Sequence, residues 1–237
     1  PALPDTVVSG SSAKITSEKQ VAVFVGCIAD AYEANTRIKL QQILTAIGFS
    51  VKPIAGQTCC GSAALHLGDA ESANTLAEIN RKAFSDKLTV LTLATGCHEQ
   101  LSRSLQTRNK VVDAIDFIMQ HSSNLTFRAA KKKIALHIPC SQSTVVKSDH
   151  STRRLLSMIP ELEIHPLPDR GCCGAAGLHM FNEQERAGQL RKPFIEDVLL
   201  SNASELLSAN IGCRLHLAKG LKIPVRHPID FLAEHLA

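Results

Sequence analysis

Short apolar runs alternate along the chain with stretches in which apolar residues recur at helical spacing. The run 21–27 (VAVFVGC) predicts a buried strand, and the stretch 31–47 predicts a helix that ends before Gly48. A strand over 49–54, a loop with the letters AGQTCCG and a helical stretch over 62–86 are expected next. A strand over 87–97 then ends at another cysteine, and further helices are expected after it and over 111–120.

The same order of elements begins again after the basic residues 131–133. A strand over 134–140 (IALHIPC) ends in a cysteine, a helix is expected at about 148–158, and a strand over 162–167 leads into the loop PDRGCCGAAG. A helical stretch over about 182–207, an apolar segment ending at 213, and a last strand and helix complete the chain. This alternation predicts an α/β fold made of two pseudo-symmetric repeats, each a small, mostly parallel sheet flanked by helices.

Cysteine positions identify the two halves as an internal repeat. A shift of 113 residues relates Cys27 to Cys140, Cys59-Cys60-Gly61 to Cys172-Cys173-Gly174, and His66 to His179. The last cysteines, Cys97 and Cys213, are 116 residues apart. So many shared spacings indicate a duplicated α/β module. We therefore expect a linker or tail over 1–20, a first module over 21–130 and a second over 131–237.

Composition narrows the class of protein. The chain of 237 residues is 44% apolar and 20% charged, as in globular proteins. A scattered net charge of +4 and an aromatic content of 4% argue against a nucleic-acid partner. No run of 18 apolar residues and no secretion signal is found, which favours a cytoplasmic chain with eight reduced cysteines. Because the chain begins at Pro1 rather than Met, we expect it to be processed or cut from a longer polypeptide.

Parallel strands would bring the cysteines together. In each half the first and last cysteines follow a predicted strand, and the Cys-Cys pair lies in the loop after the middle strand. Right-handed crossovers place these loops at one edge of a sheet, where open α/β sheets bind ligands. The two expected sites are Cys27, Cys59, Cys60 and Cys97 in the first half, and Cys140, Cys172, Cys173 and Cys213 in the second. Four thiolates around one point can hold an iron–sulfur cluster or a zinc ion.

Histidines near the cysteines are weaker candidates. His216 follows Cys213 in a C-x-x-H arrangement that suits a metal ligand, whereas the first half has Gln100 at that place. His66 and His179 either donate hydrogen bonds beside the sites or lie on solvated helix faces. The chain has no G-x-G-x-x-G, P-loop or G-x-S-x-G motif, and no catalytic residue is assigned.

The doubled pattern resembles a known family. The motif is Cys-x31-Cys-Cys-Gly-x35-Cys in the first half and Cys-x31-Cys-Cys-Gly-x38-Cys in the second. Together the two motifs are similar to the cysteine-rich CCG domain pair of the heterodisulfide reductase B-subunit family. Within that family, three segments most resemble the C-terminal part of glycolate oxidase iron–sulfur subunits: PLPDRGCCGAAG (166–177), ANIGCRLHLA (209–218) and PVRHPIDFL (224–232). Lactate-utilisation iron–sulfur proteins are the next most similar.

The resemblance implies an electron-transfer subunit. Such a subunit takes electrons from a flavin-containing dehydrogenase subunit that oxidises glycolate or another 2-hydroxy acid, and passes them toward a quinone or another acceptor. It also implies an iron–sulfur cofactor, for which four ligands favour [4Fe–4S], with zinc in one half as the alternative. A ferredoxin-type domain preceding this chain in the full-length protein, and peripheral association with the inner face of the cytoplasmic membrane through the complex, are further expectations.

One departure from the family pattern limits what carries over. Heterodisulfide reductase has C-x-x-C at the end of each motif, whereas Gln100 and His216 stand at the fourth position here. The five-cysteine clusters of that enzyme are therefore not expected. Two other function classes stay open: an enzyme that reduces disulfides at its own cysteines, and a zinc-bound or metal-free docking module.

Overall fold

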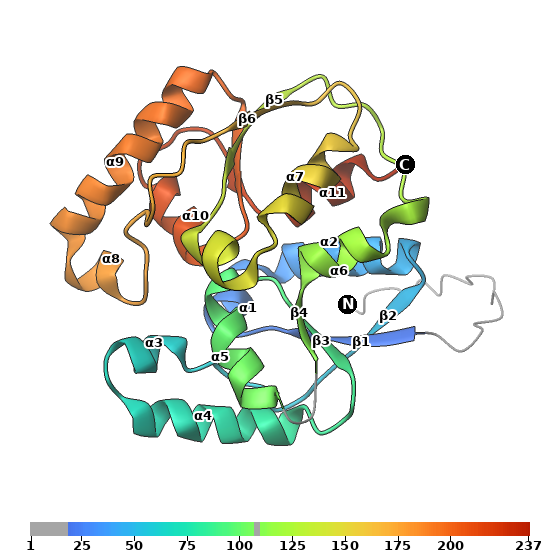
Figure 1. Ribbon diagram of the computed structural model, residues 1–237, viewed down its shortest axis with the longest axis vertical. Helices are drawn as coiled ribbons and strands as arrows, with labels where there is room; N and C mark the ends of the chain where they lie inside the picture. The colour runs from blue at the N-terminus through green and yellow to red at the C-terminus, as the bar shows by residue number, and fades with distance from the viewer. Residues whose placement is uncertain (1–18, 107–109) are drawn as a thin grey trace, which may run out of the picture.

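The computed structural model describes residues 19–106 and 110–237, and contains two four-stranded sheets (Figure 1). The strand order is β2-β1-β3-β4 in the first sheet and β6-β5-β7-β8 in the second, so the two sheets share one topology. Every strand pair in both sheets is parallel. The predicted pair of α/β repeats is therefore confirmed, and we call the sheets with their helices the first and second modules.

The first module follows the predicted order of elements, but several element boundaries differ. Its elements are β1 (Lys19–Phe24), α1 (Ile28–Tyr32), α2 (Ala34–Ala46), β2 (Phe49–Lys52), α3 (Ser62–His66), α4 (Ala70–Ala83), β3 (Thr89–Thr92), α5 (Thr95–Leu105), β4 (Val111–Asp113), α6 (Ala114–Gln120) and a 3-10 turn, Ser122–Asn124. The helical stretch predicted over 62–86 is interrupted, because Asp69 accepts a hydrogen bond from the Ser72 N–H and starts a new helix. The helix predicted over 111–120 begins as the edge strand β4.

The second module repeats this order. Its elements are β5 (Lys133–His137), a π-helical turn (Gln142–Val146), α7 (Asp149–Ser157), β6 (Glu163–Pro166), α8 (His179–Asn182), α9 (Gln184–Ser201), β7 (Glu205–Ser208), α10 (Ile211–Ala218), β8 (Val225–Arg226) and α11 (Pro228–His235). The predicted helix over 182–207 is too long. Asn202 takes a left-handed conformation that ends α9, and the following residues form the buried central strand β7. A four-residue strand carries too little periodicity to be separated from a helix by sequence.

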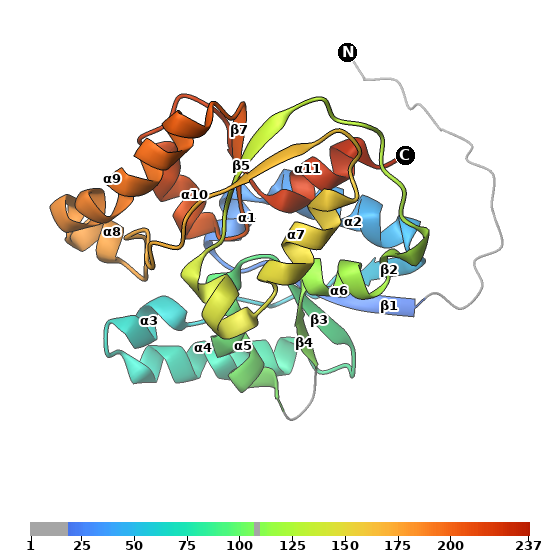
Figure 2. The same cartoon turned by 45° about the horizontal axis from the view of Figure 1, so that its top comes forward.

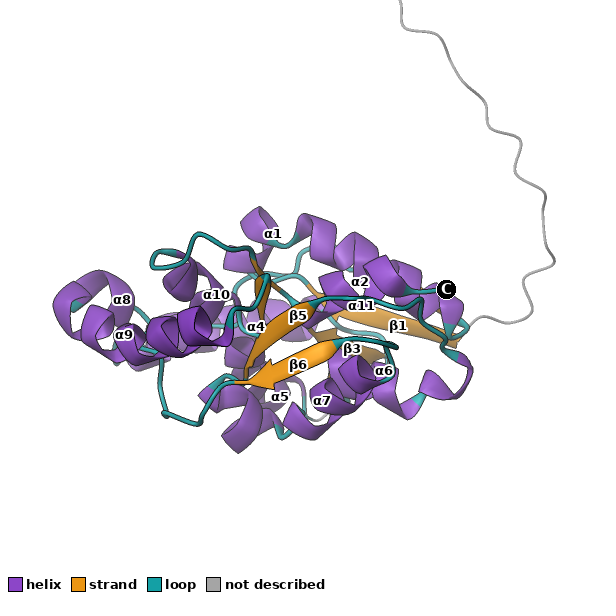
Figure 3. Ribbon diagram, turned by 90° about the horizontal axis from the view of Figure 1, so that it is seen from above, coloured by secondary structure: helices purple, strands orange, loops and turns teal. Residues whose placement is uncertain are grey.

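The helices form layers around the sheets. Helices α2 and α6 of the first module face α7 and α11 of the second, whereas α3 to α5 and α8 to α10 cover the opposite faces of their sheets (Figures 1 and 2). The N-terminal ends of α5 and α10 also reach the other module. Figure 3 shows α8 and α9 at one end of the molecule. Helix α9, with 18 residues, is the longest in the described part of the chain, and no helix there has the length and apolar character needed to cross a membrane.

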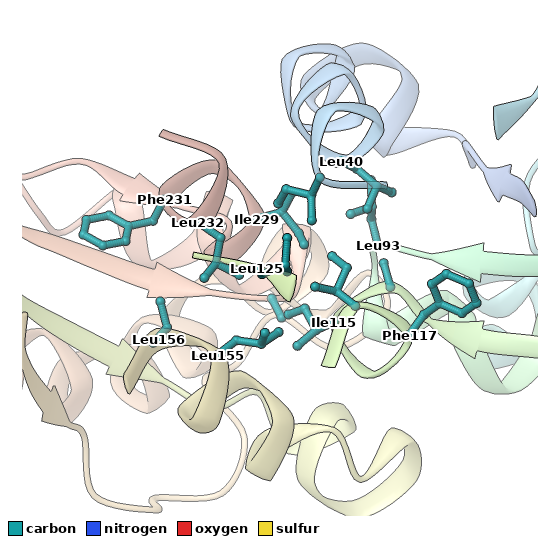
Figure 4. Packing of buried hydrophobic residues seen from close by; sticks show 14 of the residues in the cluster. Leu40, Leu93, Ile115, Phe117, Leu125, Leu155, Leu156, Ile229, Phe231 and Leu232 are labelled. Atoms are coloured by element: carbon teal, nitrogen blue, oxygen red, sulfur yellow. The ribbon is translucent and has the colours of Figure 1, made fainter. Parts of the chain in front are cut away.

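A single hydrophobic core joins the two modules. Leu40 and Ile115 of the first module belong to the same buried cluster as Leu155, Ile229 and Phe231 of the second (Figure 4). The two outer faces carry smaller clusters of their own. Because the inner helix layers bury their apolar faces against each other, the two sheets are held in one relative position. The domain division near residue 130 stays a prediction.

Candidate cysteine-rich sites

The cysteines gather at the carboxyl ends of the strands, as the topology requires. Cys27 follows β1 and directly precedes α1, while Cys140 follows β5. Cys97 and Cys213 were expected at strand ends, but each is the third residue of a helix, α5 and α10 respectively. The strands end earlier, at Thr92 and Ser208, and the chain turns into a helix within a few residues. The last cysteine of each set therefore lies in the first turn of a helix, at the positive end of the helix dipole, which favours negative charge.

Glycine shapes the Cys-Cys turn in both modules. Gly61 has φ of +83° and Gly174 has φ of +93°, a region that L-residues with side chains rarely adopt. A Cβ on Gly61 would lie 3.2 Å from the Ala73 Cα, and one on Gly174 would lie 2.7 Å from the Ala187 carbonyl oxygen. The triplet Cys-Cys-Gly is thus a packed turn in which no other residue fits without displacement of a neighbouring helix.

Backbone N–H groups of this turn point at the sulfur atoms. The Gly61 N–H donates to Cys59 Sγ over 3.4 Å and the Ser62 N–H to Cys60 Sγ over 3.5 Å. In the second module the Gly174 N–H donates to Cys172 Sγ over 3.4 Å. Such donors stabilise thiolates, and in iron–sulfur proteins they help to set the reduction potential.

Equivalent pairs of sulfur atoms interact in the two modules. Cys27 Sγ lies 3.4 Å from Cys59 Sγ, as Cys140 pairs with Cys172, and Cys173 Sγ lies 3.2 Å from Cys213 Sγ, as Cys60 pairs with Cys97. Cys27 is exposed, while Cys173 and Cys213 are buried. All eight cysteines lie within the described residues and all are free thiols. The first site is therefore the more open of the two.

The thiols of the second site differ strongly in acidity. A hydrogen bond with Cys140, helped by the backbone N–H of Gly174, lowers the pKa of Cys172 to about 5 despite its partial burial. A hydrogen bond with Cys213 likewise lowers the pKa of Cys173. The partners move the other way: contact with Cys172 raises the pKa of Cys140, and contact with Cys173 raises that of Cys213. The adjacent Cys172 and Cys173 therefore lose their protons more readily than Cys140 and Cys213.

The first site holds its protons more tightly. The contact with Cys59 and burial raise the pKa of Cys27. For Cys60, a hydrogen bond with Cys59 lowers the pKa, but contact with Cys97 and burial outweigh it and bring the value to about 12. The repeat therefore places equivalent residues in unequal electrostatic surroundings.

The donor set fits a thiolate-bound metal group in kind and number. Each module offers four thiols at one sheet edge. Contacts link Cys59 to Cys27 and Cys60, and Cys60 to Cys97, while Cys213 contacts Cys173 and interacts electrostatically with Cys140 and Cys172. Among residues 19–106 and 110–237, however, no group of three or more His, Cys, Asp or Glu side chains is assembled as a metal site. Sulfur atoms around a tetrahedral zinc lie about 3.8 Å apart, so the pairs at 3.2 and 3.4 Å would separate on binding.

The histidines take different positions. His216 is buried, with its Nε2 hydrogen-bonded to the Ala187 carbonyl and its Nδ1 without a partner in the described part of the chain. Its role as a ligand stays a prediction. His179 contacts the Gly174 carbonyl oxygen through Nδ1 at 3.2 Å, close to the Cys-Cys turn. His66 is exposed on α3 and lies beside Gly177 of the other module.

Sequence reasoning missed the side chains that hold the cysteine-bearing loops. The buried Asn80 of α4 donates from Nδ2 to the Cys59 carbonyl and accepts at Oδ1 from the Thr58 N–H, both over 2.9 Å. Asn210 caps α10 and also reaches Thr95 and Ser141. An asparagine directly before a predicted helix signals a cap, but no local signal reveals its second set of partners.

Comparison with known proteins gives one family. The family model described as "Cysteine-rich domain" matches the chain twice, at residues 21–102 and 134–218. These two matches contain all four cysteines of each site.

Individual relatives are similar at modest identity. The chain is 26% identical to one subunit of the fumarate reductase (CoM/CoB) of Methanothermobacter marburgensis, over 86% of this chain and 42% of that protein. It is 24% identical to the "Glycolate oxidase iron-sulfur subunit" of Escherichia coli, over 98% of this chain and 62% of that protein. It is also 24% identical to "Lactate utilization protein A" of Bacillus cytotoxicus, over 90% of this chain and 98% of that protein. The chain thus spans about two fifths to three fifths of the length of the first two relatives.

Proposed function

The chain belongs to the cysteine-rich domain family, and on that premise we propose that its two sets of four cysteines bind iron–sulfur clusters that carry electrons. The observation that carries the proposal is the repeated gathering of four free thiols at the carboxyl edge of a parallel sheet. That edge is where folds of this type bind their ligands. The names of two relatives, both iron–sulfur or lactate-utilisation proteins, support the same chemistry.

We propose [4Fe–4S] as the cluster type, held by Cys27, Cys59, Cys60 and Cys97 in the first module and by Cys140, Cys172, Cys173 and Cys213 in the second. A cluster bound there would supply one-electron redox chemistry. The chain's own residues provide the thiolate ligands, the N–H groups of Gly61, Ser62 and Gly174 that face three of the sulfurs, and the buried surroundings of the second site. Burial and N–H donors both tune cluster potentials.

The wider assignment rests on the named relatives. We propose that the chain is the cluster-carrying part of an oxidoreductase for glycolate or another 2-hydroxy acid, and that it accepts electrons from a flavin-containing subunit. A preceding ferredoxin-type domain, and membrane association through the assembled complex, belong to the same proposal. The relatives that support it are subunits or utilisation proteins by name, and the chain covers only part of the longer ones.

Metal and sulfide analysis of anaerobically purified and reconstituted protein tests the proposal. Two [4Fe–4S] clusters predict about eight iron and eight sulfide per chain. Cys60→Ser and Cys173→Ser remove one ligand from the first and the second site, so each is expected to lose at least about four of those iron atoms. Ser122→Ala, which removes a buried hydroxyl bonded to the Met119 carbonyl, is the matched control and should keep them all.

Three outcomes would overturn the electron-transfer proposal. Absence of both iron and sulfide after reconstitution would remove its basis. Stoichiometric zinc without iron would favour the docking module. Reduction of a disulfide by this chain alone, at a rate abolished by Cys173→Ser, would favour a disulfide-reducing enzyme.

A further inference from the structure

Three polar side chains form a hydrogen-bonded cluster where the two modules meet. Asn210 Nδ2 donates to Thr95 Oγ1 over 3.1 Å and to Ser141 Oγ over 3.3 Å, and the two hydroxyls share a hydrogen bond of 2.8 Å. Thr95 belongs to the first module, and Ser141 and Asn210 belong to the second. We call these residues the bridging triad.

Each member of the triad lies close in sequence to a different cysteine. Thr95 begins α5, two residues before Cys97, and Ser141 directly follows Cys140. Asn210 precedes Cys213 by three residues and caps its helix, because Oδ1 accepts from the Gly212 N–H over 2.8 Å and from the Cys213 N–H over 3.4 Å. One amide therefore holds the backbone of Cys213 at one end and the helix that carries Cys97 at the other.

The residues around the triad leave room for the Asn210 amide. Thr95 is buried, with 1% of its surface exposed. A Cβ on Gly96 would lie 3.0 Å from Asn210 Nδ2, and one on Gly212 would lie 3.2 Å from Asn210 Oδ1, so two glycines leave room for the amide. The repeat puts Ala94 at the position equivalent to Asn210, and alanine cannot make a reciprocal bridge. A single side chain thus serves both cysteine sets.

We propose that Asn210 is a positioning residue that couples the two cysteine sites through the bridging triad. A displacement of the first turn of α5 moves Thr95 Oγ1, which is hydrogen-bonded to the Asn210 amide, and the same amide sets the start of α10 and the place of Cys213. The position of Cys97 in the first turn of α5 is thereby transmitted to Cys213 in the second module. The coupling itself needs no metal, and only its consequence for metal binding rests on the proposed function.

Alkylation of single cysteines in the metal-free chain tests the coupling. Thr95→Val removes the hydroxyl but keeps the shape of the side chain. The rate at which iodoacetamide modifies the buried Cys213, measured by mass spectrometry of its peptide, should rise about threefold to tenfold, the range for loss of one hydrogen bond. Thr95→Ser retains the hydroxyl and should restore the original rate.

Asn80→Ala is the matched control for a local effect. Asn80 also holds a cysteine-bearing loop by two hydrogen bonds, but both go to the first module. Its removal should accelerate alkylation of Cys59 and Cys60 and leave Cys213 unchanged. The proposal is wrong if Thr95→Val changes Cys97 alone, or if it accelerates all eight cysteines equally, which would indicate general loss of stability.

A titration with Co²⁺, followed by the absorption of cobalt–thiolate bonds, tests the consequence for metal binding. In the otherwise unchanged chain, Cys60→Ser in the first module should weaken Co²⁺ binding at the second site by about fivefold or more, a usual coupling strength between two binding sites. In the Thr95→Val background the same change should leave the second site unaffected. A weakening that persists without the Thr95 hydroxyl would overturn the proposal. Lack of iron uptake with the alkylation result intact would refute the proposed function and leave the coupling standing.

Discussion

Replacing Arg214 by methionine should destabilise the fold more than any other single change of a charged residue at the module interface. Arg214 of α10 forms an ion pair with Glu33, which lies between α1 and α2 of the other module. The Glu33 side chain has 0% exposure and that of Arg214 has 8%. Burial lowers the pKa of Arg214 to about 10, a shift that Asp230 opposes, so the guanidinium remains charged at neutral pH.

The magnitude follows from what the variant leaves behind. Glu33 Oε2 already has no hydrogen-bond partner among the described residues, so loss of the guanidinium would leave a buried carboxylate without compensation. Breaking one side of a buried pair costs about 3–5 kcal/mol, which is a large part of the usual stability of a domain. With a urea dependence of about 1–3 kcal/mol per molar, the unfolding midpoint should fall by about 1–5 M.

Urea unfolding followed by circular dichroism measures this loss, and a double-mutant cycle identifies its origin. Glu33→Met combined with Arg214→Met removes both charges and should be at least about 2 kcal/mol more stable than the sum of the single changes predicts. The double variant should regain only part of the stability that Arg214→Met loses, because in both variants Asp230 lacks the nearby positive charge of Arg214.

The matched control is Lys39→Met, which removes a partly exposed ion pair with Glu234 that also crosses between the modules, at 2.7 Å. Exposed pairs contribute about 0–1 kcal/mol, so its midpoint should hardly move. If the two changes at Glu33 and Arg214 add to within about 0.5 kcal/mol, the buried pair is not coupled and the reasoning fails.

Two further changes probe stability away from this pair. The folded state holds the proton of the fully buried Asp113, because burial raises its pKa to about 7, whereas the unfolded carboxyl titrates near 3.9. The stabilising contribution of Asp113 is therefore complete below about pH 4 and is lost as the pH rises through 7. Asp113→Asn can still cap α6 and should flatten the pH dependence of urea unfolding between these values. An unchanged slope would contradict this prediction. Gly174→Ala should lower the free energy of unfolding by at least about 2 kcal/mol, because φ is positive and the new Cβ meets the Ala187 carbonyl. Gly188→Ala, in open space on α9, is the control and should raise it by up to about 1 kcal/mol. Equal thermal shifts for the two variants would refute the packed-turn argument.

Local pattern predicted the strands that precede two of the cysteines and the turn at each Cys-Cys-Gly triplet well, and the element boundaries less well. The apolar runs before Cys27 and Cys140 form strands as expected, and Gly61 and Gly174 have the positive φ that the Cys-Cys turn requires. Cys97, in contrast, lies in the first turn of α5 and not at the end of a strand. A strand of four residues is defined by its pairing with neighbours, and local periodicity over so few positions cannot separate it from the start of a helix.

The sequence by itself determined the duplication, the parallel α/β class and the eight thiols as two sets of four, because each depends on spacing and on short-range pattern. Only the tertiary structure decided that Glu33 meets Arg214 and that Asn210 reaches Thr95, since these pairs are 181 and 115 residues apart and form when the two modules pack together. The inequality of the two sites has the same origin. Equivalent cysteines differ in exposure, as Cys27 does from Cys140 and Cys97 from Cys213, and this depends on packing, which a repeat read along the chain does not contain.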